Sequence, residues 1–341
     1  MAEEAEARSK SGAGETLSDG VVSLRRRRPE DIAALIAGRD DERRRFLGPG
    51  GSDPRPAYCI ETDGELAGWI DYDRDEEHDW LASDEVNVGY ELFPPFRGRG
   101  LATRSLRLLL HHLAAEGSFA AASLLIDPAN APSLAVARRA GFPPPAALAG
   151  QAYCKKALPP LSYSDGIRTI RRQRADDLAR HLEAIDKEQM AWLWSHDERE
   201  AWREMRPAAR RAHQLAHLRR SHDEFGRGPK WRFSLDAGDE PYVAYVDCNL
   251  AAPFLPAGEA NIAYATHPRF RRRGHAAGAV RLVLAFLAEC TGAARAHLVI
   301  DAENAASLAV ARSLGASPEK ERLDEAGRHL LHHLLGLERA L

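Results

Sequence analysis

The stretch that decides the fold is Val86–Leu113, VNVGYELFPPFRGRGLATRSLRLLLHHL, which returns as Ala260–Leu287, ANIAYATHPRFRRRGHAAGAVRLVLAFL. The offset of 174 residues continues without a gap to Gly141 and Gly315. The later part reads LLIDPANAPSLAVARRAG in the first copy and LVIDAENAASLAVARSLG in the second. Solenoid units are only ~20–50 residues long, so a period of this length predicts two tandem domains.

Composition agrees with two globular domains and excludes several classes of protein. The chain has 341 residues, 44% hydrophobic and 28% charged, and a domain typically takes ~100–200 residues. A net charge of −3 gives no basic field for nucleic acid. No apolar stretch approaches the ~18–20 residues of a membrane helix, and the polar N-terminal segment lacks the apolar core of a signal peptide. We expect a cytoplasmic protein with no nucleic-acid or membrane partner.

Both halves show the same order of elements, which predicts the fold class. A short strand and a helix precede a hairpin, a central strand, a glycine-bearing turn, a long amphipathic helix, a buried strand, another helix and terminal strands. This order predicts an α/β (α+β) unit, a mixed and mostly antiparallel sheet flanked by helices. The expected parts are a disordered tail over 1–19, domains over 20–158 and 166–341, and a linker over 159–165.

The second half carries a charged insertion at 186–225 that we expect to be helical. Its tryptophans, Trp192, Trp194 and Trp202, either pack in a core or line a substrate cleft. The four cysteines are isolated in the sequence, and the histidine pairs are adjacent residues that point in different directions. We therefore expect buried cysteines and no metal site.

The junction between central strand and long helix predicts an anion site in each half. It reads Phe96-Arg-Gly-Arg-Gly-Leu-Ala102 in the first half and Phe270-Arg-Arg-Arg-Gly-His-Ala276 in the second. The first N–H groups of a helix have no partners inside the helix, and its dipole is positive at that end. Glycine lets a ligand approach the backbone, and arginine attracts phosphate. The expected binding residues are Arg97, Gly98, Arg99, Gly100, Leu101, Ala102, Arg271, Arg272, Arg273, Gly274, His275 and Ala276.

These loops and a second motif resemble those of the GNAT acetyltransferase superfamily. The family's loop reads Q/R-x-x-G-x-G/A, and both junctions match it. Its second signature, N-x-x-[AS]-x-x-[VL] followed by G-F, is matched by Asn130, Ser133, Val136, Gly141 and Phe142. The second half matches the same signature except that alanine replaces the phenylalanine. The sequence of these motifs is most similar to that of the ribosomal-protein N-terminal acetyltransferase-like branch. The arrangement of two domains resembles that of mycothiol synthase.

The resemblance implies acetyl-CoA as co-substrate and no metal. It assigns the pyrophosphate to the backbone N–H groups of the two loops. It places Asn130 and Asn304 near the thiol end of the pantetheine arm. Each asparagine also stands before a helix and fits a helix N-cap, and the two roles are compatible.

The resemblance points to Glu91, on the central strand just before the loop, as a base that acts through water. Burial would favour proton uptake by such a carboxylate. The alternative is an exposed strand carboxylate, because the sequence does not decide which face the side chain occupies. The counterpart of Glu91 is Ala265. In the second half His267 is a lone alternative base, although a turn before Pro268 explains it better.

The family's usual general acid is missing. It is a tyrosine seven residues after the asparagine of the second signature, where this chain has Ala137 and Ala311. The thiolate then leaves to water, or Ser133 or Ser307 assists through its hydroxyl group.

These observations favour an acetyl-CoA-dependent N-acetyltransferase that moves the acetyl group to a primary amine by direct attack. The acceptor is a small-molecule amine or a protein N-terminus, and the protein is a monomer or homodimer. The first domain keeps more of the family pattern and is the better candidate for catalysis. Two alternatives stay open: a non-catalytic acyl-CoA-binding or regulatory protein, and a transferase for a longer acyl group.

Overall fold

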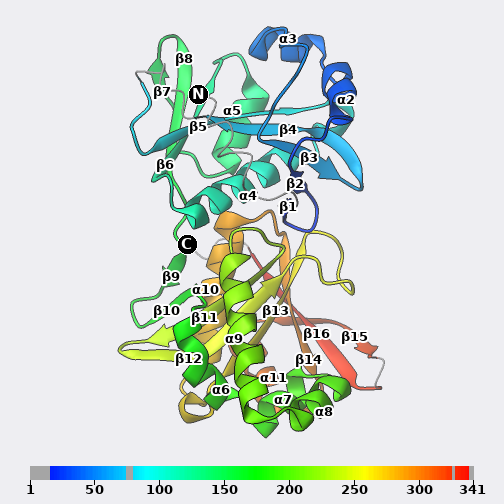
Figure 1. Ribbon diagram of the computed structural model, residues 1–341, viewed down its shortest axis with the longest axis vertical. Helices are drawn as coiled ribbons and strands as arrows, with labels where there is room; N and C mark the ends of the chain where they lie inside the picture. The colour runs from blue at the N-terminus through cyan, green and yellow to red at the C-terminus, as the bar shows by residue number, and fades with distance from the viewer. Residues whose placement is uncertain (1–15, 74–79, 325–326, 338–341) are drawn as a thin grey trace. The chain divides into compact units, whose positions relative to one another are not determined.

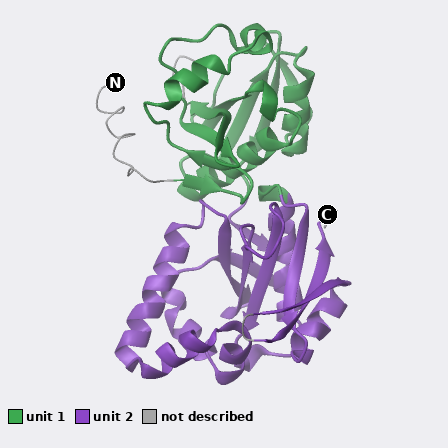
Figure 2. Cartoon of the chain, turned by 90° about the vertical axis from the view of Figure 1, so that its right-hand side faces the viewer, with its two compact units in different colours: residues 1–159, 289–292 green, residues 160–288, 293–341 purple. Residues whose placement is uncertain are grey.

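The computed structural model describes residues 16–73, 80–324 and 327–337. It divides the chain into two compact units, 1–159 with 289–292 and 160–288 with 293–341 (Figure 2). Each unit holds an eight-stranded mixed sheet with helices packed against it (Figure 1). The predicted α/β class and its duplication are therefore confirmed.

Two predicted boundaries change. Strand β1 (Thr16–Ser18) pairs with β2, so the first sheet includes residues of the predicted tail over 1–19, whose residues 1–15 lie outside the described residues. Strand β9 (Ser162–Ser164) pairs with β10 at the edge of the second sheet. Three of the seven residues of the predicted linker over 159–165 thus belong to the second sheet.

The first sheet has the strand order β1-β2-β3-β4-β5-β6-β8-β7, in which only β5 and β6 are parallel. Its strands are β2 (Ser23–Arg25), β3 (Tyr58–Thr62), β4 (Glu65–Asp73), β5 (Glu85–Leu92), β6 (Ala121–Ile126), β7 (Ala146–Leu148) and β8 (Gln151–Ala157). Its helices are α2 (Asp31–Ala37), α3 (Asp41–Leu47), α4 (Leu101–Glu116) and α5 (Ala131–Arg139), with a 3₁₀ turn η1 (Pro94–Phe96).

The second sheet has the order β15-β16-β14-β13-β12-β11-β10-β9, with β13 and β14 parallel. Its strands are β10 (Arg168–Arg172), β11 (Lys230–Ala237), β12 (Glu240–Asn249), β13 (Glu259–Thr266), β14 (Arg295–Asp301), β15 (Ser317–Leu323) and β16 (His329–Gly336). Its helices are α6 (Leu178–Ala184), α7 (Lys187–Leu193), α8 (His196–Glu204), α9 (Pro207–Asp223), α10 (His275–Cys290) and α11 (Ala305–Ser313), with 3₁₀ turns η2 (Ala175–Asp177) and η3 (Pro268–Phe270).

The parallel pair in each sheet opens into a slot. Strands β5 and β6 pair only from Glu85 to Asn87, although β5 continues to Leu92. In the second sheet β13 and β14 likewise pair only from Glu259 to Asn261. The remaining residues of the two strands form no ladder, so the strands separate after Asn87 in the first sheet and after Asn261 in the second.

The long helix after each slot packs through the face that its periodicity predicts. Leu106, Leu109, Leu110 and Leu113 of α4 are all buried, at i, i+3, i+4 and i+7. The corresponding four residues of α10 are buried as well. This packing fixes the N-terminus of each helix against its sheet. Among the described residues no helix combines the length and apolar character needed to cross a membrane.

Gly68 on β4 allows the backbone of β5 to come close at Glu91. A Cβ atom at Gly68 would lie 2.0 Å from the backbone oxygen of Glu91, and the residue has a φ of +159°. We expect Gly68→Ala to lower the free energy of unfolding of the first domain by about 1–3 kcal/mol, the usual cost of overpacking. Chemical denaturation measures this loss. Gly89→Ala is the control, since its Cβ would meet only Trp69, at 3.9 Å; equal losses in both variants would contradict the argument.

Candidate active site

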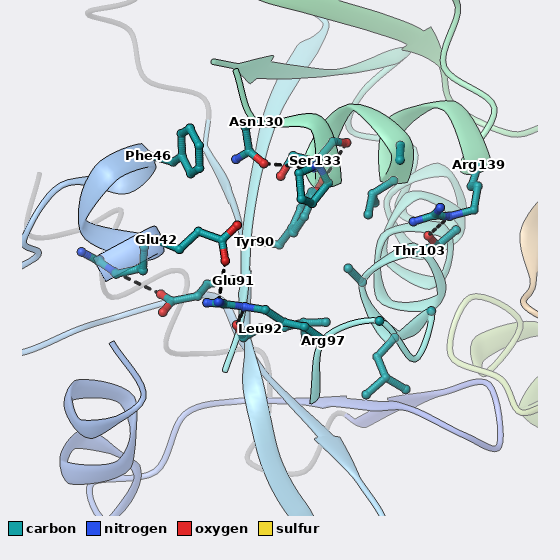
Figure 3. Close-up of a pocket in the computed structure, with 18 of the residues that line it drawn as sticks. Glu42, Phe46, Tyr90, Glu91, Leu92, Arg97, Thr103, Asn130, Ser133 and Arg139 are labelled. Carbon is teal, nitrogen blue, oxygen red and sulfur yellow. Dashed lines mark hydrogen bonds and ion pairs between the residues drawn. The ribbon is translucent and has the colours of Figure 1, made fainter. Parts of the chain in front are cut away.

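A cavity of about 670 Å³ lies in the first domain beside the slot (Figure 3). It is lined by α3, the end of β5, the glycine loop, the first turn of α4, and α5. Both Tyr90 and Glu91 line it, although consecutive strand residues point to opposite faces of a sheet. Figure 3 shows Tyr90 on the α5 side of β5 and Glu91 on the α3 side. The cavity can therefore be reached from both faces of the sheet.

The glycine loop leaves the N-terminus of α4 open to a ligand. Gly98 and Gly100 have φ angles of +74° and +78°, in the left-handed region that favours glycine. Gly100 is the N-cap of α4 and supplies no side-chain cap, so the N–H groups of Leu101 and Ala102 point out of the helix without a capping partner. A Cβ atom at Gly100 would meet nothing within 4 Å. The backbone here forms an open cradle of the kind that binds phosphate.

The side chain of Arg97 has a role that the sequence did not predict. Its Nε donates to the carbonyl of Leu92 at 2.9 Å, and its guanidinium group contacts Asp40 at 2.6 Å and Glu42 at 2.7 Å. This guanidinium holds the pKa of the Asp40 carboxyl at about 2. The side chain of Arg97 therefore anchors the start of α3. Arg99 is half-exposed and pairs with Asp63 at 3.1 Å.

The second domain repeats this anchor. Arg271 pairs with Asp186 at 2.8 Å and with Glu188 at 2.5 Å, and Asp186 caps α7 as Asp40 caps α3. The offset between the two capping aspartates is 146, from Asp40 to Asp186, against 174 at the loops. Helix α7 is thus the counterpart of α3, and the extra segment of the second domain is α8 with α9 rather than the whole of 186–225.

A second cavity, of about 810 Å³, lies beside the second loop. Gly274 has a φ of +74°, and Arg272 adopts a φ of +63° at the position of Gly98. Arg273 lies over the ring of Phe270, 5.5 Å from its centroid. His275, at the first helical position, has a buried Nδ1 with no hydrogen-bond partner among the described residues, and burial lowers its pKa.

Both candidate asparagines cap a helix, as one of the two interpretations predicts. The Asn130 side chain accepts from the backbone N–H of Ser133 at 3.1 Å, and Asn304 accepts from that of Ser307 at 3.0 Å. All four residues line the cavity of their own domain. Capping uses the amide oxygen, so the amide nitrogen can still donate to a ligand.

Glu91 is buried, which overturns the alternative of an exposed strand carboxylate. Its exposed fraction is 5%. Arg43 Nε lies 3.2 Å from Oε2, and the indole N–H of Trp69 donates to the same oxygen at 2.6 Å. The other oxygen, Oε1, is buried and has no hydrogen-bond partner among the described residues. One oxygen thus fixes the carboxylate, and the other is left to act on a ligand.

The second domain lacks this arrangement. Gln189 stands at the position of Arg43, counted from the capping aspartate, and Ala265 replaces Glu91. In strand register Tyr245 faces Ala265 as Trp69 faces Glu91. Gln189 Nε2 donates to Tyr245 Oη at 3.5 Å. The ionic cluster of Arg43 and Glu91 in the first domain is therefore replaced by the neutral pair of Gln189 and Tyr245 in the second.

Tyrosines on the central strands are site residues that the sequence reasoning missed. Tyr90 Oη donates to the backbone carbonyl of Ser133 at 3.4 Å, and burial raises its pKa to about 12. Its counterpart Tyr264 lines the second cavity, and its buried hydroxyl has no hydrogen-bond partner among the described residues. The signal was available, since a tyrosine occupies this position in both repeats.

The remaining candidates have structural roles. His267 is buried, caps η3 through a 3.3 Å hydrogen bond from the backbone N–H of Arg269, and thus confirms the predicted turn. The four cysteines are buried, as expected. Among the described residues there is no group of three or more histidine, cysteine or carboxylate side chains placed to hold a metal.

Comparison with known proteins agrees with this geometry. The family described as acetyltransferase (GNAT) domain matches residues 22–143 and 167–317, more than half of the chain. A search of curated proteins gave no match. Solved structures similar to the chain include Mycobacterium smegmatis RimJ in complex with CoA-disulfide, with 20% identity over 52% of this chain and 86% of that one and a TM-score of 0.42.

Two further structures show the same kind of match. The ribosomal L7/L12 alpha-N-protein acetyltransferase RimL shares 15% identity over 52% of this chain and 92% of its own, with a TM-score of 0.40. A GNAT-family acetyltransferase from Bacillus anthracis shares 12% identity over 52% and 99%, with a TM-score of 0.41. With the family matched once in each half, the chain belongs to the GNAT acetyltransferase family and is a tandem acyltransferase of that family.

Proposed function

We propose that the protein is an acetyl-CoA-dependent N-acetyltransferase whose first domain performs the transfer to a primary amine. The observation that carries the proposal is the position of Glu91. This buried carboxylate, with one oxygen free, lines the same cavity as the open N-terminus of α4. A phosphate cradle and a proton acceptor in one cavity are what transfer from a CoA thioester to an amine requires.

The residues present fit acetyl-CoA, which would supply an activated acetyl thioester. In the first domain the N–H groups of the Arg97–Ala102 loop would hold the pyrophosphate. The slot beside β5 would take the pantetheine arm, with the Asn130 amide nitrogen as a donor near its end. The loop Arg271–Ala276 and Asn304 would do the same in the second domain, so we propose two CoA sites and one catalytic site.

Two side chains would move the protons. The amine nitrogen forms a bond to the acetyl carbon while the bond from that carbon to sulfur breaks. Glu91 Oε1 takes the proton that the amine loses, directly or through water. Tyr90, whose pKa of about 12 keeps it protonated at neutral pH, gives its proton to the departing thiolate. Tyr90 replaces the earlier candidate Ser133 in this role, because it already donates a hydrogen bond beside the slot.

The test is a thiol-release assay of the full chain with acetyl-CoA and a panel of small amines and peptides with free N-termini. We expect release of CoA that depends on an amine, with the acetylated product identified by mass spectrometry. Binding of acetyl-CoA without turnover of any acceptor would instead favour the non-catalytic alternative. A larger rate with a longer acyl-CoA would favour the transferase of longer acyl groups.

Tyr90→Phe should lower kcat about tenfold or more, with the KM for acetyl-CoA changed less than about twofold. The reason is that loss of the phenol removes a proton donor without altering the phosphate contacts. Steady-state kinetics measures both constants. Tyr72→Phe is the control, because Tyr72 lies on the neighbouring strand and is not among the residues lining the cavity. A rise in KM at unchanged kcat would show that Tyr90 only shapes the cavity.

A further inference from the structure

The second domain holds another cavity, of about 430 Å³, between the helices α7–α9 and the strands β11 and β12. Trp194 and Trp202 line it, and their rings meet edge to face with the ring centroids 5.3 Å apart. Gln189 and Leu193 of α7 line this cavity and also the CoA cavity of the domain. A ligand in it would therefore lie beside the ligand of the larger cavity.

The floor of this cavity carries an excess of positive charge. Lys230 pairs with Asp247 at 3.6 Å, and Arg232 lies opposite Asp247 in strand register. Arg232 is half-buried, and among the described residues it makes no hydrogen bond or ion pair. Burial raises the pKa of the Asp247 carboxyl, although the charges of Lys230 and Arg232 act to lower it. A half-buried guanidinium without a partner fits a carboxylate on a ligand.

A histidine in the cavity experiences the same charge. Burial and then the charge of Arg232 lower the pKa of His217 to about 4, so its imidazole is neutral at neutral pH. Its neighbour His181 is held by Gln214, which accepts at 2.8 Å, and burial lowers its pKa too. These imidazoles add no charge to the floor, and Glu198 on the rim is exposed to solvent. The positive charge near Arg232 is thus not balanced from the helices.

Two glutamines that line the cavity offer hydrogen-bond acceptors, and one of them, Gln189, also lines the larger cavity. Gln189 is 5% exposed, and its Oε1 is buried without a hydrogen-bond partner among the described residues. Gln173, 1% exposed, also lines the cavity with an unpartnered Oε1. Buried amide oxygens normally accept hydrogen bonds, so each of these oxygens has the capacity to accept from an N–H group of a ligand.

We propose that this cavity binds a small amino carboxylic acid. Arg232 would pair with its carboxylate, and Gln189 would accept from its amine beside the CoA cavity. Gln189 contacts Tyr245, and Tyr245 is the diagonal neighbour of Arg232 across the two strands, so the partner of Gln189 lies on the same face of the sheet as Arg232. The apolar body of the ligand would lie against Trp194 and Trp202, which line the same cavity. The proposal goes beyond the proposed function, since it concerns binding in the second domain and needs no acetyl transfer.

The experiment is calorimetric titration of the full chain, without CoA, with each of the standard amino acids. The tightest binder is then compared with the amine that lacks its carboxylate and with the acid that lacks its amine. We expect both truncated ligands to bind at least about tenfold more weakly, because each loses a charged or buried hydrogen bond. Hydrogen exchange should show protection of α7–α9 on binding. Failure of every amino acid to bind, or equal binding by the amine alone, would overturn the proposal.

Arg232→Met tests the carboxylate partner in the protein. It should weaken the amino acid about tenfold or more and leave the affinity of the amine without a carboxylate unchanged. Arg219→Met is the control, because it removes the same charge from an exposed position on α9 that does not line this cavity. Equal affinity of the two variants for the amino acid would overturn the assignment of Arg232. The comparison of ligands on the unaltered chain decides the proposal even where a variant fails to fold.

Discussion

Glu91→Gln should lower kcat for acetyl transfer by roughly 10²–10⁴-fold, the usual range for loss of a general base. Glutamine keeps the size of the side chain and still accepts from Trp69 through its amide oxygen, but it cannot take up the amine's proton. The affinity for acetyl-CoA should change little, because the phosphate cradle belongs to another element. Steady-state kinetics and calorimetry of the same preparation measure the two effects.

The pH profile separates a chemical role of Glu91 from a structural one. Loss of a general base should change the shape of the pH profile of kcat/KM in the variant, whereas a merely structural loss would lower the rate equally at every pH. Glu65→Gln is the control, since Glu65 is an exposed carboxylate on β4. A kcat for Glu91→Gln within a factor of three of the unaltered protein would rule out Glu91 as the base.

Gly100→Glu and Gly274→Glu should each remove one of two acetyl-CoA sites. Each substitution places a carboxylate at the open N-terminus of a helix and forces a side chain into the left-handed region. We expect the altered loop to bind acetyl-CoA at least about 100-fold more weakly than in the unaltered protein. This loss is comparable to the removal of one or two charge-assisted hydrogen bonds. The stoichiometry by calorimetry should fall from two to one in each variant. Turnover should be lost in Gly100→Glu alone.

Matched substitutions separate charge from backbone strain in this experiment. Gly100→Asn tolerates the left-handed backbone without adding charge, so it should bind more tightly than Gly100→Glu. Gly51→Glu adds the same charge at an exposed loop position where a Cβ atom would meet nothing within 4 Å, and it should keep both sites. Loss of turnover in Gly274→Glu but not in Gly100→Glu would assign catalysis to the second domain.

Much of the fold follows from local signals in the sequence. The repeat predicted two domains, and the hairpin at Asp63–Gly64 forms with both residues at positive φ. The leucine spacing of α4 predicted its buried face, and the asparagines before α5 and α11 predicted helix caps. The hairpin, the buried face and the caps depend on neighbours within a few residues, and the repeat is found by comparing the chain with itself, which is why a single sequence reveals all of them.

The environment of Glu91 could not be predicted because its partners are distant in the chain. Arg43 is 48 residues away and Trp69 is 22, and they meet Glu91 only when α3 and β4 pack beside β5. The sequence likewise favoured Arg97 as a phosphate ligand, since nothing near it indicated a pairing with Asp40, 57 residues away. Tyr90 differs from these cases, because both repeats carry a tyrosine at this position and the sequence alone contains that signal.

The pairing of Arg97 with Asp40, repeated as Arg271 with Asp186, has a consequence for how two copies of one domain can diverge. These pairs hold α3 and α7 by their first turns, at the outer end of each helix. The inward-facing residues one turn later, Arg43 and Gln189, are then free to change without releasing the helix. A duplicated domain whose helix is held by such an ion pair can therefore change the residues that face its cavity, and with them its chemistry or binding specificity, while the fold is retained.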